Sequence, residues 1–138
     1  MTPYSSFLCR TLLACACMIC LLSADAADNA APAPVKHVKA HDAQKLLSQT
    51  NLVILDIRTP EEFKSFHIAG ATNIDFHGSD FEQRVKSLDK SKTYLVHCAS
   101  GGRSTQSLKF FQKYDFQSIY HLDGGINAWK NAGLPVAK

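Results

Sequence analysis

The chain has 138 residues, of which 46% are hydrophobic and 20% charged, and its formal net charge is +3 at pH 7. This length allows one domain rather than two, and the apolar content excludes a wholly disordered chain. The small charge and the lack of a basic cluster argue against a nucleic-acid partner, and the absence of internal self-similarity argues against a repeat protein.

The first 26 residues have the features of a secretory signal peptide. Arg10 precedes an apolar run of 12 residues, and an Ala-x-Ala cleavage site ends at Ala26. We therefore predict export to the periplasm, with membrane contact only through this signal peptide. An uncleaved anchor is disfavoured because the run is too short to span a bilayer. Lipid attachment at Cys15 is disfavoured because only four residues separate it from Arg10.

Cleavage after Ala26 would remove four of the five cysteines and leave Cys98 as the single thiol. A lone thiol in an oxidising compartment is either buried and inert or kept for its chemistry. Residues 27–36, rich in Ala and Pro, are predicted to form a flexible spacer, and residues 37–138 a folded domain.

Short apolar runs then alternate with helical patterns. Strands are expected near residues 35–38, 52–55, 72–74, 94–96 and 119–122, and helices near residues 42–47, 60–66, 81–88, 103–114 and 126–132. The continuous apolar run at 52–55 is typical of a strand buried on both faces. This alternation predicts an α/β domain with a mainly parallel sheet, whose ligands bind beyond the carboxyl ends of the strands.

A strong helix start follows the strand at 52–55. Thr59 can cap the helix, Pro60 suits its first position, and Glu62 completes a capping box. Phe63 and Phe66 are expected to face inward from this helix.

The segment Cys98-Ala99-Ser100-Gly101-Gly102-Arg103-Ser104 joins a predicted strand to a predicted helix. Its glycines allow tight curvature, the helix offers its positive end, and Arg103 adds a fixed cation, so we predict an anion cradle with a sulfur nucleophile at its rim. A helix terminus supplies up to ~2 kcal/mol, which lowers a thiol pKa of about 8.5 by only about one unit. Ionisation at neutral pH therefore needs the amide cradle or Arg103 as well.

Four ordered motifs resemble those of the rhodanese-like family. They lie at residues 55–63, 67–74, 98–104 and 122–135, and the resemblance covers roughly residues 38–137. It implies a three-layer αβα fold with a mainly parallel, about five-stranded sheet. It also implies a sulfurtransferase that needs no cofactor.

The resemblance also implies roles for individual residues. Cys98 would be the nucleophile that carries a persulfide between a donor such as thiosulfate and a thiol, cyanide or protein-thiol acceptor. The substrate-binding residues would be Ala99, Ser100, Gly101, Gly102, Arg103 and Ser104. The related phosphatases and arsenate reductases have one more residue between cysteine and arginine, so the six residues from Cys98 to Arg103 favour sulfur chemistry.

Other polar residues are interpreted as structural. Asp56 and Arg58 would support the site, with Asp56 able to accept backbone N–H groups near the cysteine loop. His97 is assigned to the core because adjacent strand residues point to opposite faces. Arg103 has an alternative role as the partner of a carboxylate.

The remaining histidines, His37, His41, His67, His77 and His121, are scattered without ligand spacing, so no metal is expected. Two alternatives to a small-molecule sulfurtransferase stay open. One is a non-catalytic or redox-sensing module that binds a partner, and the other is a persulfide carrier to one specific protein.

Overall fold

The computed structural model describes residues 34–138, in which five strands alternate with five helices. They are β1 (Val35–Val38), α1 (Ala40–Leu46), β2 (Leu52–Asp56), α2 (Pro60–Ser65), β3 (Thr72–Asn73), α3 (Phe81–Lys86), β4 (Thr93–His97), α4 (Gly102–Lys113), β5 (Ser118–Leu122) and α5 (Gly125–Asn131). The predicted signal peptide and residues 27–33 of the predicted spacer lie outside the described residues. None of the described helices has the length and apolar character needed to cross a membrane.

The strands form one sheet in the order β1-β5-β4-β2-β3, and each pairing among the described residues within it is parallel. This confirms the predicted α/β class and strand number. Strand β1 begins at Val35, two residues before the predicted domain boundary at residue 37.

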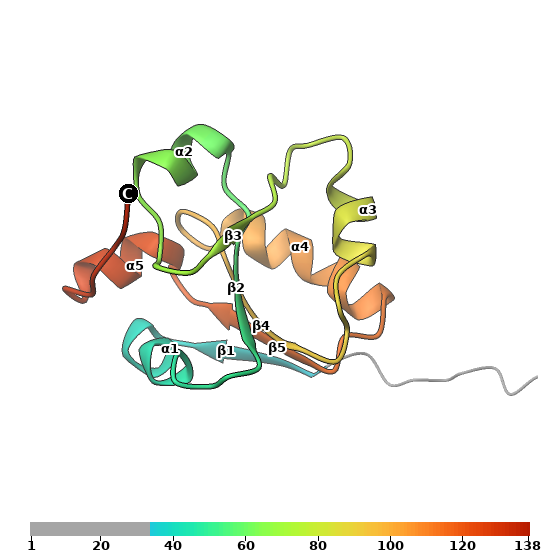
Figure 1. Ribbon diagram of the computed structural model, residues 1–138, viewed down its shortest axis with the longest axis horizontal. Coiled ribbons are helices and arrows are strands. Elements are labelled where there is room, and N and C mark those ends of the chain that lie inside the picture. The colour runs from blue at the N-terminus through green and yellow to red at the C-terminus, as the bar shows by residue number, and fades with distance from the viewer. Residues whose placement is uncertain (1–33) are drawn as a thin grey trace, which may run out of the picture.

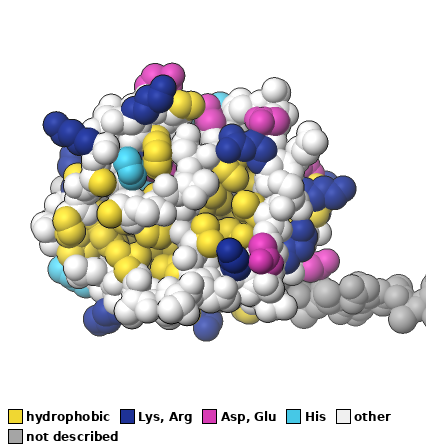
Figure 2. All heavy atoms as spheres, viewed as in Figure 1, with side chains coloured by type: hydrophobic (Ala, Val, Ile, Leu, Met, Phe, Trp, Pro, Cys, Tyr) yellow, Lys and Arg dark blue, Asp and Glu magenta, His cyan; other side chains and the backbone are white. Residues whose placement is uncertain are grey.

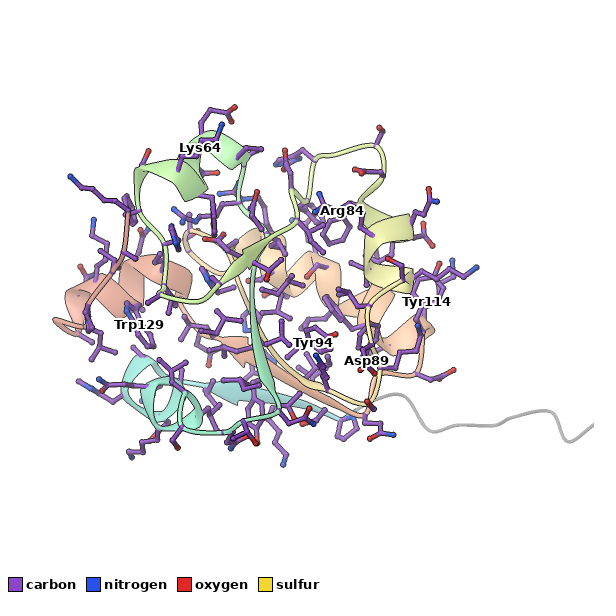
Figure 3. The ribbon with its side chains drawn as sticks, viewed as in Figure 1. Lys64, Arg84, Asp89, Tyr94, Tyr114 and Trp129 are labelled. Carbon is purple, nitrogen blue, oxygen red and sulfur yellow. The ribbon has the colours of Figure 1, made fainter. Side chains whose placement is uncertain are left out.

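The sheet lies between two layers of helices (Figure 1), with α3 and α4 on one face and α1 and α5 on the other. Neighbouring strand residues alternate between the two cores, as Tyr94 and Leu95 do on β4. Figure 3 shows Tyr94 on the α3/α4 side and Trp129 between α5 and α1. The sheet is covered on both faces, which accounts for the continuous apolar runs in β2 and β4.

Aromatic rings fill much of the α3/α4 side. Phe116 packs edge-on against both Phe111 and Tyr94, with ring centroids 5.1 Å and 5.3 Å apart. Phe111 is fully buried, and its truncation to Ala would cost about 3–5 kcal/mol. This layer supports the helix that follows the cysteine loop.

Helix α2 begins with the predicted capping box. The Glu62 backbone N–H donates to Thr59 Oγ1 at 3.3 Å, and the Thr59 N–H donates to Glu62 Oε2 at 3.0 Å. The expectation that Phe63 and Phe66 face inward holds only in part, since both are half-buried. The reason is that α2 lies beyond the carboxyl end of β2 rather than flat against a face of the sheet (Figure 1).

Figure 2 shows one face of the molecule, on which basic and acidic side chains are interspersed around the rim. No large area of a single charge stands out on this face, in keeping with the small net charge.

Candidate active site

The cysteine loop lies where the sequence predicts it, at the carboxyl edge of the sheet. Cys98 directly follows β4, and α4 starts at Gly102. Gly101 takes a left-handed conformation with φ of 103°, which turns the chain sharply into α4. The side chain of Cys98 is almost enclosed, since the residue is only 1% exposed.

Hydrogen-bond donors surround the sulfur. The Gly101 N–H donates to Cys98 Sγ at 3.1 Å, and the Ser104 hydroxyl lies 3.4 Å from the same atom. Burial opposes ionisation and is the largest single influence on this thiol. The hydroxyl of Ser104 and the N–H groups of Ser104, Gly101 and Ser100 outweigh burial together, so the pKa of Cys98 lies below its ordinary value. The loop favours a thiolate.

The carbonyl side of the loop is fixed by α5. The Ile126 N–H donates to the Cys98 carbonyl at 2.9 Å, and the Asn127 N–H donates to the Ala99 carbonyl at 3.0 Å. A Cβ at Gly125 would lie 2.5 Å from the Cys98 oxygen, and the φ of Gly125 is +57°. Only glycine fits at this position. Because the carbonyls of Cys98 and Ala99 are bound by α5, the N–H groups of the loop remain free to face the sulfur. The sequence shows a Gly-Gly turn but not this close approach.

Arg103 forms a two-point ion pair with Glu62. Its Nη1 and Nη2 atoms donate to Glu62 Oε2 and Oε1 at 2.7 Å and 2.9 Å. The hydrogen bond from Arg103 is the largest influence that lowers the pKa of Glu62, to about 2. The predicted alternative, in which Arg103 pairs with a carboxylate, is confirmed. Binding of a sulfur donor by Arg103 stays a prediction, and the guanidinium keeps further N–H donors for it.

Sequence reasoning gave Glu62 only the role of a helix cap. The structure adds the contact with Arg103, which lies 41 residues further along the chain. One carboxylate therefore both caps α2 and orients the arginine of the cysteine loop.

Asp56 and Arg58 form a buried pair at the end of β2. Arg58 Nη2 lies 2.6 Å from Asp56 Oδ2, and the two side chains are 2% and 0% exposed. Arg58 Nη2 also donates to the Phe66 carbonyl at 2.6 Å. The backbone N–H that Asp56 accepts belongs to Arg58 and not to the cysteine loop, which corrects the expected contact. The pair supports the segment that leads into α2.

His97 is buried beside this pair, as predicted for a core residue. Its Nε2 lies 3.8 Å from Asp56 Oδ2 and has no hydrogen-bond partner among the described residues. Burial is the main cause that lowers the pKa of His97. Its Nδ1 lies 3.2 Å from the Cys98 carbonyl rather than from the sulfur, so His97 is not placed as a base for the thiol.

The structure brings together two of the histidines that look scattered in the sequence. His37 on β1 and His121 on β5 are direct partners in the sheet, and the Nδ1 atom of each lies within 3.0 Å of Asp123 Oδ1. The three side chains place their polar atoms within 4.8 Å of one another. Their separation along the sequence therefore does not keep His37 and His121 apart in the fold. The expected absence of a metal stays a prediction.

A family model described as the rhodanese-like domain matches residues 39–132. The chain belongs to the rhodanese-like domain family. Its cysteine loop, clamped by the N–H groups of Ile126 and Asn127 in the first turn of α5, is thus the candidate active site of a rhodanese-like domain.

Several relatives are 30–34% identical to this chain over the residues that align. A chloroplastic thiosulfate sulfurtransferase of Arabidopsis thaliana is 32% identical over 80% of this chain and 98% of its own length. A sulfurtransferase of Allochromatium vinosum is 30% identical over 68% of this chain and 86% of its own. An uncharacterized Synechocystis protein is 34% identical, and the match spans 69% of this chain and only 52% of that protein.

Solved structures agree with the rhodanese-like fold. A rhodanese-related protein from Thermoplasma volcanium superposes with a TM-score of 0.66 at 30% identity, covering 74% of this chain and 97% of that one. The Alr3790 protein from Anabaena superposes with a TM-score of 0.65 at 28% identity, covering 72% of this chain and 81% of that one. These likenesses support the three-layer rhodanese-like fold.

Proposed function

We propose that this rhodanese-like protein transfers a sulfane sulfur from thiosulfate, or a similar donor, to a thiol or cyanide through a persulfide on Cys98. The observation that carries the proposal is the environment of the sulfur. Cys98 Sγ receives the Gly101 N–H and lies beside the Ser104 hydroxyl in an enclosed loop, and this environment favours a thiolate. Two relatives named as sulfurtransferases are 30% and 32% identical to this chain.

The first half-reaction loads the sulfur. The Cys98 thiolate attacks the outer sulfur of thiosulfate, and a new S–S bond forms as the S–S bond of thiosulfate breaks. Sulfite leaves with the electron pair of that bond. The N–H groups of the loop and the positive end of α4 stabilise the anionic outer sulfur of the persulfide.

The second half-reaction unloads it. Cyanide attacks the outer sulfur of the persulfide and leaves as thiocyanate. The electron pair of the broken S–S bond returns to Cys98, which becomes a thiolate again. With a thiol acceptor, the product is the acceptor's persulfide. The same thiolate is therefore the nucleophile of the first step and the leaving group of the second, which is a ping-pong reaction.

Arg103 would orient the oxygens of the donor. Its guanidinium is held by Glu62 at two points, and the Arg103 side chain is 20% exposed. A planar fork with free N–H donors matches the oxygens of thiosulfate. The ion pair with Glu62 would limit how far this cation can turn away from the loop.

We also propose that the protein works after export to the periplasm. The proposal rests on the first 26 residues, which have the charged start, apolar run and cleavage site of a signal peptide. Fractionation of cells that express the full chain would test it, since a periplasmic protein would have lost the mass of these residues.

The intact mass of the purified, reduced protein tests the sulfur transfer. Thiosulfate should add one sulfur atom, cyanide should remove it, and the Cys98→Ser variant should gain none. No uptake by the folded wild-type protein would contradict a thiosulfate sulfurtransferase. Uptake followed by poor turnover on small acceptors would instead indicate a carrier for one protein.

A further inference from the structure

A chain of polar side chains runs from the sulfur toward the surface on the β5 side of the loop. Ser104 Oγ lies 3.4 Å from Cys98 Sγ and 2.9 Å from His121 Nε2, and His121 Nδ1 lies 3.0 Å from Asp123 Oδ1. Ser104 is fully buried and His121 is 3% exposed. The sulfur is therefore connected to a buried imidazole through a single hydroxyl group.

The partners of His121 fix where its protons can be. The hydrogen bond from His37 is the main cause that holds the pKa of Asp123 below its ordinary value, so Asp123 is a carboxylate. A carboxylate only accepts, so the Nδ1 of His121 carries a hydrogen. In the neutral ring Nε2 is then an acceptor that faces Ser104, and in the imidazolium it becomes a donor to Ser104.

The hydroxyl of Ser104 has one proton and three possible acceptors. They are Cys98 Sγ, His121 Nε2 and the Gly101 carbonyl, whose oxygen lies 3.0 Å away. When Nε2 carries no proton, it competes with the sulfur for the hydroxyl proton of Ser104, and the sulfur can lose that hydrogen-bond donor. When Nε2 carries a proton, it donates to Ser104 Oγ and leaves the hydroxyl free to point at the sulfur.

We propose that His121 takes up the proton of the resting Cys98 thiol through Ser104, and that Asp123 stabilises the imidazolium that forms. The S–H bond breaks as its proton moves to Ser104 Oγ, and the hydroxyl proton of Ser104 moves to Nε2. One proton changes place and no electrons are transferred, so no co-reactant is needed. The product is a thiolate that faces the Ser104 hydroxyl and is paired with a buried imidazolium.

This inference deepens the proposed function, because it rests on Cys98 as the nucleophile. It makes His121 and Asp123 positioning residues, since they act on the sulfur through Ser104 rather than on the substrate. Because the thiolate is both attacking and leaving group, the imidazolium can keep its proton throughout the cycle. The Ser104 hydroxyl then stabilises the sulfur in both half-reactions.

The surroundings of His121 fit this role. Thr105 Oγ1 lies 3.4 Å from Nε2, and the ring of His37 lies 4.9 Å from that of His121 between centroids. Asp123 is the charged group that contacts the ring, and among the described residues no lysine or arginine is hydrogen-bonded to it. His37 and His121 share the Oδ1 atom of Asp123 as their hydrogen-bond partner.

The pH dependence of cysteine alkylation tests the relay. The rate at which iodoacetamide alkylates Cys98 in the free, reduced protein, measured on the peptide that contains this residue, follows its thiolate fraction and needs no sulfur donor. We expect His121→Gln to raise the midpoint by roughly one pH unit, which is about a tenfold slower reaction below the midpoint. His67→Gln is the matched control, because His67 is half-buried and its ring contacts Phe63 rather than Ser104 or Asp123, and the midpoint of this variant should stay that of the wild type.

Two further variants separate the relay from a general effect of charge or folding. Asp123→Asn changes a half-exposed residue and should raise the midpoint in the same direction even if His121→Gln folds poorly. In a Ser104→Ala background, His121→Gln should add no further shift, because both residues act through one hydroxyl.

Some results would overturn the inference. Unchanged midpoints in both His121→Gln and Asp123→Asn would do so. A full shift that persists without the Ser104 hydroxyl would do so as well, since His121 would then act by charge through space. A shifted alkylation midpoint in a protein that takes up no sulfur from thiosulfate would support the relay while contradicting the proposed donor.

Discussion

Two arginine–carboxylate pairs stand near the carboxyl edge of the sheet, and they differ in how much water reaches them. Arg58 and Asp56 are 2% and 0% exposed, whereas Arg103 and Glu62 are 20% and 34% exposed. The first pair holds the chain between β2 and α2, and the second lies beside the cysteine loop. Burial makes the loss of either single member of the first pair costly and closes the pair to ligands. Partial exposure makes the second worth little for stability and leaves it open to an anion.

The largest expected effect comes from breaking the buried pair. Arg58→Met leaves the Asp56 carboxylate buried without a counter-charge, which should lower the free energy of unfolding by about 3–5 kcal/mol. Urea denaturation of the purified protein measures it. Arg103→Met is the matched control and should cost less than about 1 kcal/mol.

A double variant sharpens this result. Asp56→Leu together with Arg58→Met removes both charges, so the double variant should recover part of the stability lost in Arg58→Met alone. If Arg58→Met proves no more costly than Arg103→Met, burial does not distinguish the two pairs.

The next largest effect concerns the exposed pair and the donor. Arg103→Lys keeps the charge but loses the planar fork, so the KM for thiosulfate should rise roughly tenfold while kcat changes little. Initial rates of thiocyanate formation measure both constants. A fall in kcat at constant KM would mean that Arg103 acts on the transferring sulfur rather than on the oxygens of the donor.

As the pH falls, the stability of the fold should first decline through His97, beside the buried pair, and then through Glu62 of the exposed pair. Burial holds the pKa of His97 below its ordinary value, so the unfolded chain takes up a proton at a higher pH than the folded one. Stability should therefore decline as pH falls below about 6.5. Glu62, whose pKa is lowered from 4.5 to about 2, stabilises the fold above pH 4.5, and its contribution is lost only as pH falls toward 2.

Denaturation midpoints between pH 7.5 and 5 test the part played by His97. His97→Gln should have a shallower dependence on pH than the wild type, and His67→Gln should not. Equal slopes in all three proteins would show that His97 does not govern this range.

The smallest expected effect is that of Glu62→Gln. The amide oxygen can still accept the Thr59 N–H and keep the cap, so the cost in unfolding free energy should stay below about 1 kcal/mol. The KM for thiosulfate should rise by less than it does in Arg103→Lys, because the guanidinium keeps its charge but loses a firm anchor. A lower KM would show instead that Glu62 competes with the donor for Arg103.

Local patterns predicted most of this fold, and the contacts between distant segments escaped them. The apolar run at residues 52–55 and the capping box at Thr59 are local signals, and both are confirmed. The contact of His37 with His121 depends on β1 lying beside β5, which no short pattern encodes. Once the strand order is known, the register places these two histidines opposite each other.

The functional loop divides in the same way. Cys98 and its glycines form a recognisable motif, so their place at the sheet edge could be predicted. The ion pair of Glu62 with Arg103 was not predicted, because the role of Glu62 as a helix cap already accounted for a carboxylate at that position. Ser104 was assigned to the substrate, whereas its hydroxyl lies between the sulfur and a histidine that comes 17 residues later.

The clamp from α5 also determines where this loop could be lengthened by design. Cys98 and Ala99 are tied through their carbonyls to Ile126 and Asn127, and the carbonyl of Gly101 already accepts the first hydrogen bonds of α4. Ser100 is the residue between these two anchored ends. A redesign could lengthen the cysteine loop by one residue so that it admits a tetrahedral oxyanion in place of a sulfur atom. The insertion would have to be made beside Ser100.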